Sequence, residues 1–239
     1  MSKKRISNEV FQQLLIPSTA TLTSALKQLG LSRSFIHGVA PLRPNMKMAG
    51  PAFTLRYIPA REDLNAGEVD NMKDVQRIAI EEIGVGEVFV IDARGDTRAG
   101  TMGDILATRL FKRGAAGVVT DGAFRDSPAI AEIGIPAFAA AMNAHSNKTV
   151  HHPSEIQVPI ACGEVAVLPG DIIVGDAEGV VAIPIRLAEE AAQIAVEMEM
   201  REKFILKKIQ SGASIVGSYP PDESTLAEYK VWKNNNKEG

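Results

Sequence analysis

Residues 86–126 read GEVFVIDARGDTRAGTMGDILATRLFKRGAAGVVTDGAFRD and carry the pattern that decides the fold. The apolar run at 88–91 predicts a buried strand, and the run at 116–120 predicts a second one. Between them, Leu106, Ala107 and Leu110 recur at helical spacing, and Gly114 ends that helix. A right-handed crossover sets the two strands parallel. The loops that follow them therefore lie at one edge of the sheet, where ligands of α/β proteins usually bind.

Three charged residues stand at this edge: Asp104 in the first turn of the helix, and Arg125 and Asp126 after the second strand. A guanidinium can fork onto a carboxylate or a keto oxygen. The two acids offer the hard oxygen ligands that Mg²⁺ or Mn²⁺ prefers. The helix start adds an anion site of backbone amides, those of Gly103, Asp104, Ile105 and Leu106. The alternative reading is structural, with Asp104 as a helix-start residue and Arg125–Asp126 as a surface pair.

Asp104, twenty further residues and then Arg125-Asp126 together resemble a family signature, D-x20-R-D. It is that of class II 4-hydroxy-4-methyl-2-oxoglutarate/4-carboxy-4-hydroxy-2-oxoadipate aldolases. These enzymes belong to the RraA-like family, which is named after the regulator of ribonuclease E activity. The segments GDILAT, GVVTDGAFRD, ACGEVAVLPGD and VGDAEGVVAIP also resemble that family. The resemblance runs from Thr21 to Pro221 and so covers most of the chain.

The resemblance implies a mechanism and an assembly. Asp126 would coordinate Mg²⁺ or Mn²⁺, Arg125 would contact the keto oxygen of a small 2-oxo acid, and Asp104 would hold a water on the metal. The amides of Gly103 to Leu106 would bind the substrate carboxylate. Family members form homotrimers or hexamers with the site at a subunit boundary, and the same chemistry would decarboxylate oxaloacetate. The family pattern has an acidic residue where this chain has Ala129, which leaves the exact substrate open.

Two readings compete with a metal-dependent aldolase. One is a non-catalytic RraA-type regulator that binds ribonuclease E, and the presence of Asp104 and Asp126 argues against it, because a regulator needs no metal-binding acids. The other is a methyltransferase, which would require a glycine-rich cofactor loop directly after a strand.

A Schiff-base aldolase would need a desolvated lysine, and Lys112 lies beside Arg113 on the outer side of its helix.

Composition narrows the class of protein. The 239 residues are 45% apolar and carry a net charge of −3 without a basic stripe, so nucleic acid is not an expected partner. Cys162, the single cysteine, is expected to be a buried, inert thiol. We find neither a stretch of eighteen apolar residues nor a signal-peptide pattern, so we expect a cytoplasmic protein with no membrane span.

The rest of the chain predicts a single domain over residues 1–239, with a helical N-terminal segment and a C-terminal helix plus tail at 187–239. Turn signals at 157–184 predict tight antiparallel strands that pack on the central unit. The expected fold is therefore a compact layered α/β/β/α sandwich, of the swivelling-domain type found in the RraA-like family. The further expectations are helices at 8–15, 18–29, 71–83, 128–133 and 187–210, strands at 48–58 and 136–140, loops at 31–45 and 60–69, and a fraying or neighbour-bound tail at 219–239. Residues 142–155 are expected to form a solvated loop that shapes the rim of the pocket.

Overall fold

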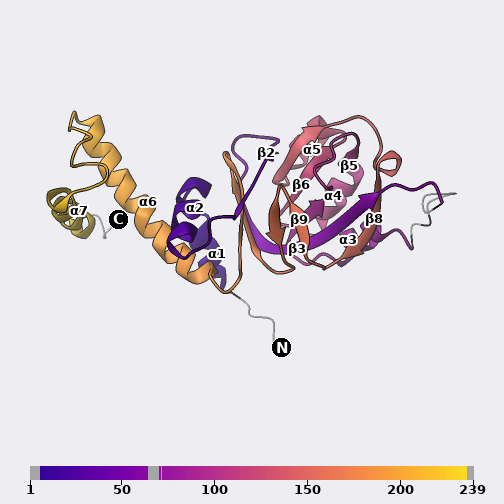
Figure 1. Cartoon of the computed structure of the whole chain (residues 1–239), viewed down its shortest axis with the longest axis horizontal. Coiled ribbons are helices and arrows are strands. Elements are labelled where there is room, and N and C mark those ends of the chain that lie inside the picture. Colours follow the sequence, from indigo (N-terminus) through magenta and orange to yellow (C-terminus); the bar gives the residue numbers. More distant parts are fainter. Residues whose placement is uncertain (1–5, 64–69, 71, 236–239) are drawn as a thin grey trace.

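The computed structural model describes residues 6–63, 70 and 72–235. The helices are α1 (Asn8–Leu14), α2 (Thr19–Gln28), α3 (Val75–Glu82), α4 (Asp104–Lys112), α5 (Ser127–Ile133), α6 (Ala188–Gln210) and α7 (Glu223–Asn235), with a 3-10 turn, η1 (Asn147–Thr149). The strands are β1 (Phe35–Ile36), β2 (Ala40–Pro41), β3 (Met48–Pro59), β4 (Val88–Asp92), β5 (Gly100–Met102), β6 (Gly117–Phe124), β7 (Ala137–Met142), β8 (His151–Ile156), β9 (Ile160–Cys162), β10 (Val165–Val167), β11 (Ile172–Asp176) and β12 (Gly179–Ile183). The predicted α/β/β/α layering is confirmed, and Figure 1 shows how its elements are arranged.

A parallel set of strands forms the centre of the molecule. Strand β4 pairs in parallel with β3 and β6, and β6 pairs in parallel with β7. The predicted parallel pairing of the strands at 88–91 and 116–120 is confirmed, with Val88 opposite Gly117. Alternate residues of β4 face opposite layers: Phe89 and Ile91 pack with the helices α3, α4 and α5, whereas Val90 packs with β9–β12.

Antiparallel strands build the second β layer. Strands β11 and β12 form a hairpin, and β11 pairs with the first residues of β3. Strand β3 therefore joins both layers, because its later residues pair with β4. Helices α1, α2 and α6 cover the outer face through a buried cluster that includes Leu22, Ile172 and Ala191. Asp176 holds the hairpin turn to the start of α2, since its carboxylate accepts from Thr19 N at 2.8 Å.

Several segments predicted as loops contain strands. Strand β5 lies inside the glycine-rich loop after β4, short strands β1 and β2 lie within 31–45, and β8 begins at His151 and so includes the end of 142–155. The solvated loop expected at 142–155 is wrong for His151, which is fully buried and stacks on Tyr57 at 5.3 Å between ring centroids. Strand β8 forms because it pairs antiparallel with the edge of β3, a contact that local sequence does not reveal.

The C-terminal region also differs from its prediction. The helix expected at 187–210 is confirmed as α6, but the tail expected at 219–239 contains helix α7, and residues 236–239 lie outside the described part. Figure 1 shows α6 running away from the layered body and carrying α7 at its far end. Helix α7 packs on α6 through aromatic contacts of Tyr229 and Trp232 with Phe204.

The structure also tests the predictions for the start of α3, for Cys162 and for a membrane span. Helix α3 begins at Val75, later than the predicted 71, because Asp74 caps it by accepting from Arg77 N at 3.1 Å. Cys162 is fully buried, as predicted, and burial raises the pKa of its thiol well above the usual range. Residue 71 of the predicted helix and residues 64–69 of the loop predicted at 60–69 lie outside the described residues. Within the described part of the chain, the search for a helix long and apolar enough to cross a bilayer finds none.

Candidate active site

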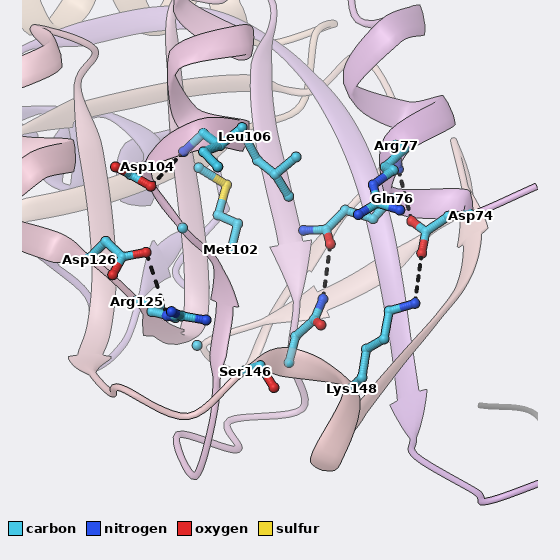
Figure 2. A pocket seen from close by; sticks show the side chains of 14 residues that line it. Asp74, Gln76, Arg77, Met102, Asp104, Leu106, Arg125, Asp126, Ser146 and Lys148 are labelled. Atoms are coloured by element: carbon cyan, nitrogen blue, oxygen red, sulfur yellow. Dashed lines mark hydrogen bonds and ion pairs between the residues drawn. The ribbon is translucent and has the colours of Figure 1, made fainter. Parts of the chain in front are cut away.

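A cavity of about 490 Å³ opens where the central parallel strands end. Strand β5 pairs with the end of β6, with Gly100 opposite Ala123, and then leads directly into α4. The cavity is lined by Asp74, Gln76, Arg77, Gly100, Met102, Gly103, Asp104, Ile105, Leu106, Arg125, Asp126, Ser146, Asn147 and Lys148. Every site residue predicted from the sequence is in this set, and Figure 2 shows Asp104, Arg125 and Asp126 on one side of the space. We call that side, residues 100–106 and 125–126, the near wall.

The near wall depends on two glycines at close approaches. The Arg125 amide donates to the Met102 carbonyl at 3.0 Å, which brings the backbone of 125 against β5. A Cβ on Gly100 would lie 2.7 Å from both Cβ and N of Arg125, so only glycine fits there. A Cβ on Gly103 would lie 2.7 Å from Asp126 Oδ2, which places this carboxylate beside the residue that precedes Asp104.

Asp126 has an unusual backbone conformation. Its φ is +55°, in the left-handed region, and its side chain makes no capping hydrogen bond to α5 although it occupies the N-cap position. A non-glycine residue in this region costs on the order of 1–3 kcal/mol and is found preferentially at ligand sites. The side chain is 40% exposed, and its Oδ2 lies 3.6 Å from Arg125 Nε, with the arginine side chain 49% exposed. The carboxylate and the guanidinium are therefore both accessible from the cavity.

One backbone amide at the start of α4 is already bonded to an acid of the same helix, Asp104. Gly103 is the N-cap and offers no side chain to the first-turn amides, and Asp104 Oδ1 instead accepts from Ile105 N at 2.8 Å. Of the amides predicted to bind an anion, that of Ile105 is thus already used. Ile105 also lines the cavity, and this residue is 79% exposed.

The opposite side of the cavity was predicted only in part: the segment 142–155 was expected at the rim, whereas the contribution of α3 was not foreseen. Its residues are Asp74, Gln76 and Arg77 at the start of α3 and Ser146, Asn147 and Lys148 at η1, and we call them the far wall. Lys148 Nζ lies 3.4 Å from Asp74 Oδ2, as Figure 2 shows, so an ion pair joins the two elements. The sequence pattern around Asp74 indicates only that it can cap a helix. No motif links Asp74 with Ser146, Asn147 or Lys148, which lie more than seventy positions later.

Buried polar groups lie behind the far wall. Gln76 is 3% exposed and donates through Nε2 to the Thr101 carbonyl at 2.8 Å. The Tyr57 hydroxyl donates to the same carbonyl at 3.0 Å. Burial raises the pKa of Tyr57 well above its usual range, so this hydroxyl stays protonated and remains a donor.

The donor set fits magnesium better than zinc. Among the described residues, no group of three or more His, Cys, Asp or Glu side chains is gathered for a metal ion. A structural or catalytic zinc needs three or four such ligands. Mg²⁺ is commonly held by one or two carboxylates, with water and ligand oxygens completing its shell. Asp104 and Asp126 at one cavity match that requirement. Ala129, where the sequence departs from the family pattern that it resembles, is exposed on α5.

A family model described as RraA-like, Aldolase/RraA, matches residues 19–182. The match covers more than half of the chain and includes both walls of the cavity. The chain belongs to the RraA-like family. Helices α6 and α7 lie beyond the matched residues of this family member.

Individual relatives of this RraA-like chain carry two kinds of name. A Halalkalibacterium halodurans protein, provisionally named a 4-hydroxy-4-methyl-2-oxoglutarate aldolase, is 32% identical over 181 residues, 76% of this chain and 80% of that protein. The solved structure of Streptomyces coelicolor RraAS2, described as an unusual member of the RNase ES inhibitor RraA family, has a TM-score of 0.76 and 34% identity, and covers 84% of this chain and 97% of its own. Legionella pneumophila DlpA is 28% identical over 86% of this chain, which spans only 32% of DlpA.

Proposed function

We propose that this RraA-like protein is a divalent-metal-dependent aldolase that cleaves a 4-hydroxy-2-oxo acid into pyruvate and a second 2-oxo acid. The observation that carries the proposal is the meeting of Asp104, Arg125 and Asp126 at one cavity. The relative named for 4-hydroxy-4-methyl-2-oxoglutarate aldolase activity supports it. The unusual conformation of Asp126 adds to this support, because such conformations are common where a ligand is held.

The chemistry requires a stabilised enolate. Breaking the C3–C4 bond leaves negative charge on the pyruvyl half, and a catalyst must bind that charge more tightly as it develops. Arg125 presents N–H donors that would meet the keto oxygen as it becomes the enolate oxygen. The amides from Gly103 to Leu106 would hold the substrate carboxylate, and the Ile105 amide would exchange its bond to Asp104 for one to the substrate.

Asp104 and Asp126 would have different roles at the metal ion. Asp126 would hold Mg²⁺ or Mn²⁺, and Asp104 would hold a water beside it. When bound, the cation supplies Lewis-acid polarisation of the keto group. The proton of the 4-hydroxyl would pass to water, and reprotonation of the enolate releases pyruvate. Oxaloacetate yields the same enolate when it loses carbon dioxide, so we propose its decarboxylation as a second activity.

The test is a pyruvate-release assay on the full chain. With Mg²⁺ and 4-hydroxy-4-methyl-2-oxoglutarate or oxaloacetate, pyruvate should form, and a chelator should abolish its formation until Mg²⁺ is restored. Asp126→Asn should lose activity by about 10²-fold or more while staying folded, since asparagine tolerates the left-handed conformation but lacks the charge. Turnover that continues undiminished after complete chelation would sink the mechanism.

A second candidate is a regulator that binds ribonuclease E, favoured by the likeness to an RNase ES inhibitor relative. Inhibition of a ribonuclease E cleavage assay by the purified chain would support it. The two functions separate in the Asp126→Asn variant, because a regulatory surface does not depend on this carboxylate. Inhibition equal in wild type and variant, with no pyruvate release by either, would replace the aldolase proposal.

We also propose that the chain forms a homo-oligomer, a trimer or a hexamer. Ile105 at the cavity rim is 79% exposed and Met142, at the end of β7, is 68% exposed. A neighbouring copy would remove such apolar side chains from water. Light scattering at the concentrations used for the assay should give three or six times the mass of one chain, and a monomer would contradict this proposal.

A further inference from the structure

One backbone carbonyl is the meeting point of three separate elements. The Thr101 carbonyl in β5 accepts from Tyr57 Oη of β3 at 3.0 Å and from Gln76 Nε2 of α3 at 2.8 Å. Asn147 Nδ2 of η1 approaches the same oxygen at 3.5 Å. A carbonyl has two lone pairs, so the two shorter bonds are the strong ones. This strand is therefore attached to the elements of the far wall as well as to the sheet.

An amide pair joins the two halves of the far wall. Asn147 Nδ2 donates to Gln76 Oε1 at 3.0 Å, while Gln76 donates its own N–H to Thr101. Both side chains line the cavity, but the acceptor and one donor of the Gln76 amide are already used within the protein. Gln76 is thus placed to fix the position of η1, and with it Ser146 and Lys148, relative to β5.

The near wall is attached to the same strand from the other direction. The Met102 carbonyl accepts from the Arg125 amide at 3.0 Å, and Thr101 Oγ1 donates to the Ala123 carbonyl at 3.0 Å. Gly103 then begins α4, which carries Asp104. Strand β5 is common to both walls. The segment at η1 is held by the backbone bond from Gly100 N to the His145 carbonyl at 2.9 Å, by the Lys148–Asp74 ion pair and by the amide pair, and the amide pair is the buried side-chain contact among them.

We propose that Gln76 and Asn147 are positioning residues that set the length of the 2-oxo acid that the site accepts. The inference rests on the proposed aldolase function. The pyruvyl half of a substrate meets Arg125 and Asp126, whereas the half beyond the scissile bond extends toward Ser146 and Lys148. Loosening the amide pair moves the far wall and leaves the near wall attached to β6, so discrimination between long and short substrates changes.

The experiment compares three reactions that reach different distances across the cavity. They are exchange of the C3 protons of pyruvate in D₂O, decarboxylation of oxaloacetate, and cleavage of 4-hydroxy-4-methyl-2-oxoglutarate. Gln76→Met keeps the length of the side chain and removes both hydrogen bonds. Its KM for the longest substrate should rise about tenfold more than its KM for pyruvate exchange, an effect within the range expected when hydrogen bonds of this kind are lost. The kcat for the longest substrate should change less than its KM.

Asn147→Leu is the milder second variant, because it retains the bond from Gln76 to Thr101 and lies at a partly exposed position. It should shift the same ratio in the same direction. The double variant should be no worse than Gln76→Met, since both substitutions remove one shared interaction. Gln12→Met, on the exposed surface of α1, is the matched control and should leave all three reactions unchanged.

Three outcomes decide the question. A wild-type chain that is inactive in all three reactions overturns the proposed function and this inference with it. An active wild type with equal losses across the reactions in Gln76→Met, or with no loss in any, overturns this inference alone. A selective shift in the KM of the longest substrate, repeated in Asn147→Leu and absent in the control, supports it.

Discussion

The near and far walls of the cavity are built on different principles. The near wall presents charged side chains that are about half exposed, Arg125 at 49% and Asp126 at 40%, on a backbone brought close by glycines. The far wall is held by a buried amide, Gln76, whose hydrogen bonds are made within the protein. The contrast teaches that the near wall presents charged groups to a ligand, whereas the far wall sets the width of the cavity. Substitutions should therefore affect activity on one side and selectivity or stability on the other.

The largest effect is expected from Arg125→Ala. Removing a donor that meets developing charge should lower kcat/KM by about 10²–10³-fold. The free energy of unfolding should change by less than about 0.5 kcal/mol, because the ion pair with Asp126 is exposed. Pyruvate release and urea denaturation measure the two quantities.

Arg109→Ala is the matched control for that prediction. Arg109 lies on α4, is also 49% exposed and pairs with Glu81 at 2.7 Å, but it does not line the cavity. Its activity should stay at the wild-type level. Similar losses in both variants would break the distinction between the near wall and the remaining surface.

The next effect is expected from Gly103→Ala. The added Cβ would lie 2.7 Å from Asp126 Oδ2, so the carboxylate must move. A displacement of this kind can lower the rate by about 10²-fold, while the fold tolerates it because a carboxylate can rotate. Gly84→Ala is the control, since its Cβ would also face an acid, Glu87 Oε2 at 3.2 Å, outside the cavity. Wild-type kcat in Gly103→Ala would contradict the assignment of Asp126.

The buried groups that support the far wall should respond differently from the near wall, and Tyr57→Phe tests this. The substitution removes one donor to the Thr101 carbonyl, which keeps its bond from Gln76. We expect the free energy of unfolding to fall by about 1 kcal/mol and kcat/KM for oxaloacetate to fall by less than about threefold. Urea denaturation and the decarboxylase assay measure them. A loss as large as that of Arg125→Ala would mean that the walls do not differ in role.

The smallest effect concerns a buried acid on the strand that leads to the near wall. Asp121 of β6 accepts backbone N–H bonds from Ala93 at 2.7 Å and Gly95 at 2.9 Å, and burial raises its pKa. Between its unfolded pKa of about 3.9 and its higher folded pKa, the folded chain binds more protons than the unfolded chain. The free energy of unfolding contributed by Asp121 therefore falls as pH rises through that window.

Asp121→Asn should remove this slope, whatever it does to the absolute stability. Urea denaturation in steps from pH 4 to 7 measures the slope in both proteins. Parallel curves for wild type and Asp121→Asn would show that burial does not shift the acid as described.

The sequence was sufficient for the near wall because its parts lie within one continuous unit. A strand, a helix start and a second strand follow one another, and the crossover rule places Asp104 beside Arg125 and Asp126 without further information. Both β layers were likewise predictable from apolar runs and turn residues. The roles of the three residues stay predictions until the variants are measured.

The α3 part of the far wall, and its contacts with the segment at 142–155, could not be predicted because they join distant parts of the chain. Gln76 lies in an ordinary amphipathic helix and Asn147 in a polar stretch, and neither pattern reveals a hydrogen bond across 71 positions. His151 was misjudged for the same reason: a polar segment becomes buried when it pairs with the edge of β3. Helix α7 was missed because its aromatic residues stabilise it only by packing on α6.

The attachment of both walls to strand β5 has an evolutionary consequence. If the sheet of a divergent homologue twists more or less, β5 shifts and takes both sides of the cavity with it. The spacing of the two walls can then survive large changes in core packing, provided that the donors to the Thr101 carbonyl are retained. Conversely, a few substitutions among those donors could give a descendant a new preference for ligand length without any change in Asp104, Arg125 or Asp126.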